Sequence, residues 1–133
     1  HRSSYPSPYC MRNILIAEDE SFIATLYKTH FEQHPGIKVT IASDGKQAVA
    51  ALEKEKFDLL LLDLIMPNMD GYEVLAYFKK KELKLPVVVV LSNLSLDIDK
   101  AECRRLGAED YIVKADNDAP AVWDKVQKYL PAE

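Results

Sequence analysis

The sequence predicts an α/β fold, a doubly wound parallel sheet of five strands with helices on both faces. Short apolar runs alternate five times along the chain with longer stretches whose apolar residues recur at helical spacing. Most of the runs are apolar throughout, which is typical of strands that are covered on both faces. Right-handed crossovers between such parallel strands place helices on both sides of the sheet.

Four of the predicted strands are fully apolar and one alternates. The alternating strand carries Val39 and Ile41 between polar residues, as expected of a short or edge strand. The fully apolar strands cover residues 14–17, 59–62, 87–91 and 111–113. Each of them is too short to cross a lipid bilayer, so we expect no membrane span.

Capping residues mark two of the helices between these strands. Asp44, with Gln47 three residues later, predicts a capping box at the start of one helix. Gly107 follows a helical stretch at about residues 97–106 and occupies the position at which a left-handed residue commonly ends a helix. These two boundaries are therefore predicted independently of the strands.

Length and composition limit the possible functions. The chain has 133 residues and a net charge of -4, so we expect one domain without a nucleic-acid surface, which would need a basic patch. Cys10 and Cys103 form neither a disulfide framework nor a metal-ligand spacing, which favours a reducing, cytoplasmic location. Residues 1–10 show no periodicity and read as an expression leftover or a disordered tail. The folded domain is expected at residues 11–133.

Polar residues follow four of the predicted strands. In doubly wound sheets the ligand site lies beyond the carboxyl ends of the strands, at the point where the strand order reverses. The residues at these ends are Glu18, Asp19 and Glu20 after the first strand, Asp63 after the third, Ser92 and Asn93 after the fourth, and Lys114 after the fifth. We therefore expect carboxylates, a hydroxyl and an ammonium group to converge on one shallow pocket.

These groups together favour phosphoryl chemistry assisted by a divalent metal. Clustered carboxylates repel one another unless a cation neutralises them, and oxygen ligands of this kind suit Mg²⁺, or Mn²⁺ in its place. Asp63 would then act as a nucleophile towards a phosphoryl group, while Lys114 and Ser92 would bind the phosphoryl oxygens.

Each of these residues, taken alone, has a more ordinary interpretation. An Asp at a strand end usually caps a helix or forms a turn, and an acidic triplet such as residues 18–20 usually lies at a solvated helix N-terminus. Lys114 alone would be a surface cation. Unrelated capping residues would not all occur at the same end of four strands, however, so the joint pattern favours a functional site.

Several segments resemble the receiver domains of bacterial response regulators. The resemblance rests on residues 14–20, 59–71, 87–92 and 107–114, and its most specific stretch reads DLIMPNMDG from Asp63 to Gly71. It covers the chain from Met11 to the end. It implies a flavodoxin-like fold of strand order 2-1-3-4-5. It also implies phosphorelay signal transduction, in which a phosphorylated aspartate changes the conformation of the domain to control an output.

The resemblance assigns a role to each residue of the predicted site. Asp63 would be the phosphorylated residue and Lys114 the lysine that binds the phosphoryl group. The metal ligands would be Glu18, Asp19, Asp63 and the backbone carbonyl of Ile65, and we expect Asp19 to take the deeper position of the acidic pair. Ser92 and Tyr111 would form the conformational switch.

The resemblance also implies the partners of the domain. A sensor histidine kinase or a phosphotransfer protein would donate the phosphoryl group. An output domain or a downstream protein would bind the face formed by the fourth helix, the fifth strand and the fifth helix. No direct contact with nucleic acid or membrane is expected. We expect no enzymatic activity beyond the phosphorylation and slow dephosphorylation of the chain itself.

Two residues depart from the family pattern. Family members usually carry a proline after the lysine, in a cis peptide, but Ala115 follows Lys114 here. A cis peptide before alanine would cost about 3 kcal/mol, so the loop is either rebuilt in trans or strained. Asn93 replaces a residue that is usually small, such as alanine, and would restrict access to the phosphoryl group.

Two apolar side chains are expected to control water at the acceptor. Ile65 lies two residues after Asp63, and Leu94 lies two residues after Ser92. In family members that lose the phosphoryl group quickly, these positions tend to carry polar groups that orient the attacking water. Ile65 and Leu94 cannot do so, which predicts slow dephosphorylation, unless Leu94 merely packs at the start of the fourth helix.

Three other classes of protein compete with this interpretation. A phosphatase of the haloacid-dehalogenase type would need a second Asp two residues after Asp63, where Ile65 stands. A flavodoxin-like FMN carrier would need a phosphate-binding loop where residues 18–20 are acidic and repel an anion. A degenerate receiver, which acts as a phosphorylation-independent interaction module, remains the alternative.

Overall fold

The structure is a computed structural model that describes residues 11–132, and it consists of one parallel sheet and five α-helices. The strands are β1 (Arg12–Ala17), β2 (Ile37–Ala42), β3 (Leu59–Leu62), β4 (Val87–Ser92) and β5 (Asp110–Val113). The helices are α1 (Ser21–Phe31), α2 (Gly45–Lys54), α3 (Gly71–Lys80), α4 (Asp97–Arg105) and α5 (Ala119–Val126), with two 3-10 helices, η1 (Lys114–Asp116) and η2 (Gln127–Tyr129). The predicted tail, residues 1–10, lies outside the described residues.

The order of the strands is β2-β1-β3-β4-β5 and every pairing is parallel, which confirms the predicted flavodoxin-like fold. The order reverses between β1 and β3, so the crevice at their carboxyl ends is the expected ligand site. Two backbone hydrogen bonds extend the sheet into this crevice. Glu18 N donates to Ala42 O, and Asp63 N donates to Ala17 O, each at 3.0 Å.

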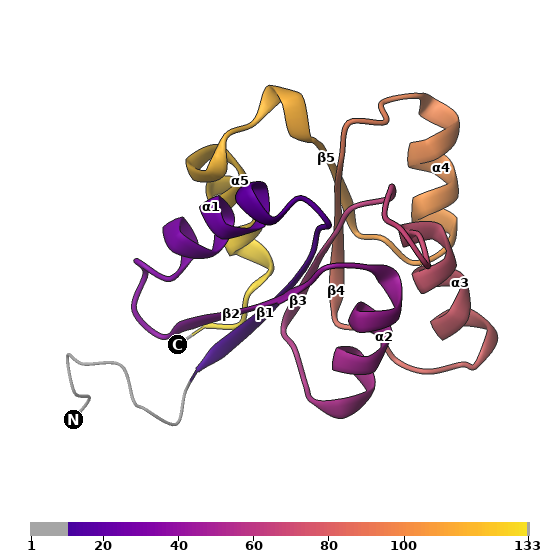
Figure 1. Cartoon of the computed structure of the whole chain (residues 1–133), viewed down its shortest axis with the longest axis horizontal. Helices are drawn as coiled ribbons and strands as arrows, with labels where there is room; N and C mark the ends of the chain where they lie inside the picture. The colour runs from indigo at the N-terminus through magenta and orange to yellow at the C-terminus, as the bar shows by residue number, and fades with distance from the viewer. Residues whose placement is uncertain (1–10, 133) are drawn as a thin grey trace.

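Helices cover both faces of the sheet. Figure 1 shows α1 and α5 on one side and α2, α3 and α4 on the other. On the first side, Phe31 of α1 packs against Trp123 of α5 at 5.2 Å between ring centroids, within one buried apolar cluster. A second cluster lies under the other three helices and includes Leu75, Phe78 and Cys103. The strands contribute to both clusters because their side chains alternate between the two faces.

Capping residues lie at the two helix boundaries that the sequence predicts, the start of α2 and the end of α4. The Asp44 carboxylate accepts a hydrogen bond from Gln47 N at 2.8 Å, as expected of an N-cap. The Gln47 side chain accepts from Ser43 N instead of Asp44 N, so the reciprocal bond of the box is displaced by one residue. Gly107 has a φ of +112° and follows α4, which confirms the predicted left-handed end.

The structure also agrees with the expectation for the alternating strand. β2 lies at an edge of the sheet and its burial partly alternates along the strand, as the spacing of Val39 and Ile41 predicts. Within residues 11–132, no helix combines the length and the apolar character that crossing a bilayer requires.

Candidate functional site

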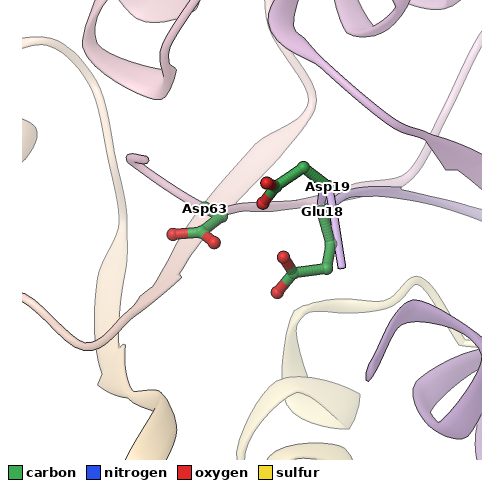
Figure 2. Close-up of side chains that lie close together, drawn as sticks. All are labelled: Glu18, Asp19 and Asp63. Carbon is green, nitrogen blue, oxygen red and sulfur yellow. The ribbon is translucent and has the colours of Figure 1, made fainter. Parts of the chain in front are cut away.

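Three carboxylates converge at the carboxyl ends of β1 and β3. Glu18 and Asp19 follow β1, Asp63 follows β3, and one oxygen from each lies within 4.8 Å of the others. Figure 2 shows the three side chains around one space. Carboxylate oxygens in such a group form the donor set that Mg²⁺ prefers, so the residues fit a divalent metal.

The two acidic residues after β1 differ in burial. Glu18 is 3% exposed, whereas Asp19 is exposed to solvent. The expectation that Asp19 takes the deeper position is therefore wrong for the structure. The reason is the direction of the chain, because Glu18 still belongs to the sheet through its bond to Ala42 O, while Asp19 lies in the turn that leads to α1.

Lys114 holds two of the carboxylates together. Its Nζ atom lies 2.6 Å from Glu18 Oε1 and 2.9 Å from Asp63 Oδ2. Burial alone would lower the pKa of Lys114, but its hydrogen bonds to Glu18 and Asp63 outweigh that effect and raise the pKa above its usual value. Burial raises the pKa of the Glu18 carboxyl although Lys114 donates to it. The lysine is therefore a protonated, fixed cation beside Asp63.

Ser92 and Tyr111 meet at the backbone of Leu94. Ser92 ends β4 and is fully buried, and its Oγ atom accepts a hydrogen bond from Leu94 N at 3.3 Å. The Tyr111 hydroxyl donates to Leu94 O. The two residues that the sequence assigns to a switch thus contact the same segment between β4 and α4.

The side chains of Ile65 and Leu94 have different environments. Ile65 is 61% exposed on the loop after β3, and its N–H donates to Asp63 Oδ1 at 3.3 Å. Leu94 is half-buried and packs against the apolar cluster beneath α2, α3 and α4. Packing against this cluster is thus one role of Leu94.

The loop between β3 and α3 is anchored by residues that the sequence reasoning did not assign to the site. Asn68 has a φ of +67°, and its side-chain amide donates to Asp44 Oδ2 at 2.7 Å. Gly45 N donates to Met69 O at 2.9 Å. A Cβ atom on Gly45 would lie 2.1 Å from that oxygen, so only glycine allows the approach. The pair Asp44-Gly45, a common turn signal, was the available clue.

One hydrogen bond joins the two departures from the family pattern. The Asn93 side-chain oxygen accepts from Ala115 N at 2.7 Å. No peptide bond between residues 11 and 132 is cis, so the loop after Lys114 is rebuilt in trans. A proline at this position would have no N–H, whereas Ala115 has one that Asn93 accepts. The two unusual residues therefore form one interaction.

Comparison with known proteins agrees with the geometry. The family model described as the response regulator receiver domain matches residues 14–122. The alkaline phosphatase synthesis transcriptional regulatory protein PhoP of Bacillus subtilis is 36% identical over 103 residues, which cover 77% of this chain and 42% of that protein. The chain therefore spans less than half the length of this relative.

Solved structures of receiver domains share the fold. The receiver domain of the Francisella response regulator 1452 superposes with a TM-score of 0.80 at 30% identity, over 89% of this chain and 95% of that one. The response regulator TrrA of Thermotoga maritima, solved in complex with Mg²⁺ and beryllofluoride, gives a TM-score of 0.75 at 28% identity, over 90% and 99% of the two chains. Together with the match to the family model, these findings show that the chain belongs to the receiver domains of two-component response regulators.

Proposed function

We propose that this domain accepts a phosphoryl group on Asp63 and changes conformation when it does so. The position of Lys114 carries the proposal, because its ammonium group lies 2.9 Å from Asp63 Oδ2 inside a cluster of carboxylates. A cation in this position balances the charge of the acceptor before the reaction and that of the phosphoryl oxygens after it.

The chemistry proposed for Asp63 is nucleophilic attack on phosphorus. One carboxylate oxygen forms the new O–P bond, the bond between phosphorus and the donor's leaving atom breaks, and its electron pair leaves with the donor. Mg²⁺ bound by Glu18, Asp19, Asp63 and the backbone carbonyl of Ile65 would neutralise charge on the phosphoryl oxygens. The complex of TrrA with Mg²⁺ and beryllofluoride supports this assignment by similarity.

Ser92 and Tyr111 are proposed to transmit the change. When Ser92 moves inward to bind a phosphoryl oxygen, its contact with Leu94 N is lost and the segment before α4 is released. Tyr111 then turns into the space that is vacated and gives up its bond to Leu94 O. The face formed by α4, β5 and α5 would differ between the two states, as in a two-state element biased by a local charge.

The partners follow from the family. A sensor histidine kinase or phosphotransfer protein would supply the phosphoryl group in the cytoplasm, and an output domain or downstream protein would bind the face of α4, β5 and α5. The domain would catalyse only its own phosphorylation and dephosphorylation. The alternative is a degenerate receiver without phosphoryl transfer, and the presence of Glu18, Asp19, Asp63 and Lys114 in one cluster argues against it.

The first prediction concerns the acceptor. Wild-type protein incubated with Mg²⁺ and acetyl phosphate should gain one phosphoryl group, about 80 Da in intact mass. Asp63→Asn should gain none, because the amide oxygen is a poor nucleophile. Asp58→Asn, which alters an aspartate bonded to Asn13 at the start of β1, is the matched control and should still be phosphorylated. An undiminished adduct in Asp63→Asn would contradict the assignment.

The second prediction concerns the metal. Asp19→Asn should weaken Mg²⁺ binding by at least about tenfold, the loss typical of a disturbed metal site. Among the described residues, Lys114 pairs with Glu18 and Asp63 and not with Asp19, so Asp19 is the carboxylate for which Lys114 does not compete with the metal. Calorimetric titration measures the affinity, with Glu20→Gln as the control. Equal Mg²⁺ affinities of Asp19→Asn and wild type would show that Asp19 is not a ligand of the metal.

The third prediction concerns the switch. Addition of beryllofluoride and Mg²⁺, which together mimic the phosphoryl group, should move amide resonances of α4, β5 and α5 in a ¹H–¹⁵N spectrum. The same mixture should leave Asp63→Asn unchanged. Shifts confined to α1 and α2 would refute the proposed route through Ser92 and Tyr111.

The fourth prediction concerns the lifetime of the phosphorylated state. Ile65→Asn combined with Leu94→Glu should speed hydrolysis of the phosphorylated Asp63 at least about tenfold, because polar groups would orient the attacking water. A tenfold increase corresponds to an activation free energy lower by about 1.4 kcal/mol. Leu96→Glu makes the same change on an exposed residue of the same segment and should leave the rate unaltered. Loss of phosphate within seconds in wild type, or no acceleration in the double variant, would show that neither side chain controls the water.

A further inference from the structure

The first turn of α4 is tied to α3 by a hydrogen bond that the proposed function does not use. The hydroxyl of Tyr72 donates to Asp99 Oδ1 at 2.6 Å. Tyr72 is the second residue of α3, and Asp99 is the third residue of α4. The bond therefore joins two helices that are neighbours on one face of the sheet (Figure 1).

α4 has few buried side chains to hold it, although its Lys100 Nζ lies 5.9 Å from the centroid of the Tyr111 ring. Among its nine residues only Cys103 is buried, whereas α3 buries Gly71, Val74, Leu75 and Phe78. Leu96 and Ile98, at the start of α4, are 67% and 73% exposed. An isolated helix of this length is not stable in water, so its position depends on the contacts that remain.

Tyr72 is held firmly on the α3 side. Asp70 and Glu73 form a complete capping box around it, with bonds of 2.8 and 3.1 Å. The ring packs against the buried cluster beneath α2, α3 and α4. Burial, followed by the bond to Asp99, raises the pKa of Tyr72, so the hydroxyl keeps its proton and remains a donor. A displacement of the first turn of α4 must therefore break the bond, because the tyrosine does not follow.

Tyr72 and Tyr111 together hold the segment from residue 94 to residue 99. The Tyr111 hydroxyl donates to Leu94 O at its beginning, and the Tyr72 hydroxyl donates to Asp99 at its end. Under the proposed function, the first bond is lost when the phosphoryl group draws Ser92 inward. The second bond has no part in that movement and opposes it.

We propose that Tyr72 is a positioning residue that holds α4 in its resting place and thereby weakens binding of the phosphoryl group at Asp63. The inference rests on the proposed function for the link to Asp63. Its thermodynamic basis is that a contact present only in the resting state reduces the fraction of molecules competent to bind, and the apparent affinity falls by the same factor. Removal of the contact should therefore improve binding at a site that it does not touch.

The experiment compares two tyrosines of the same helix. Tyr72→Phe removes the bond to α4, whereas Tyr77→Phe removes a bond of 3.0 Å from the Tyr77 hydroxyl to Glu53 of α2. Beryllofluoride is titrated in saturating Mg²⁺ and followed by amide resonances. Tyr72→Phe should bind about fivefold more tightly than wild type, the effect of one ordinary hydrogen bond. Tyr77→Phe should bind as wild type does.

Further variants separate this effect from simple damage. Asp99→Ala removes the acceptor and should tighten beryllofluoride binding as Tyr72→Phe does. The double variant should bind no more tightly than either single variant, because both changes remove the same hydrogen bond. A purely structural role would weaken binding or leave it unchanged. Equal affinity of wild type and Tyr72→Phe, or additive gains in the double variant, would overturn the proposal.

Amide hydrogen exchange gives a reading that does not depend on phosphoryl chemistry. The amides in the first turns of α4 should exchange about fivefold faster in Tyr72→Phe than in wild type, while those of α2 and α3 should not change. If wild type binds no beryllofluoride, the proposed function fails. The exchange rates of Tyr72→Phe then decide whether Tyr72 holds α4. Rates equal to those of wild type would overturn the proposal that it does.

Discussion

The compensation of buried negative charge by Lys114 is the constraint on which the functional end of the molecule depends. Glu18 and Asp63 are 3% and 6% exposed, and carboxylates so placed are costly unless a cation pairs with them. The cation comes from the end of the fifth strand, so the ion pairs connect β1 and β3, at the centre of the sheet, with β5 at its edge. These ion pairs therefore form only when β1, β3 and β5 are in place.

The balance of charge in the pocket bears on the proposed binding of both a metal cation and a phosphoryl group. Three carboxylates face one ammonium group, which leaves two negative charges uncompensated. A divalent metal beside the exposed Asp19 would offset them and remove the repulsion that an incoming phosphoryl group would otherwise meet. Lys114 by itself stabilises the resting pocket, and the proposed reaction would need additional positive charge.

The fold and the cluster of charged residues were predictable from the sequence because both depend on where the strands end. Apolar runs locate the strands, and polar residues directly after them share one edge, so Glu18, Asp63 and Lys114, which meet in the structure, could be picked out from the sequence. Burial within a turn was not predictable, which is why Glu18 and Asp19 were ranked wrongly. The bonds from Ala115 N to Asn93 and from Tyr72 to Asp99 were also missed, since partners 22 and 27 residues apart carry no periodic signal.

The contacts of the domain divide it into a rigid part and a lightly held part. The segment after β3 is fixed by Asp44, Gly45 and the close approach of Gly71, where a Cβ atom would lie 2.3 Å from Asp63 O. The segment after β4 is held instead by separate hydrogen bonds, among them those of Ser92, Tyr111 and Tyr72, and by the packing of Leu94. A residue that accepts a phosphoryl group would have to keep its geometry during the reaction, whereas signalling requires a part of the domain to move. A pocket bordered by one fixed loop and one weakly held loop meets both needs, because the charge that phosphorylation would add at Asp63 can act on the less firmly held segment.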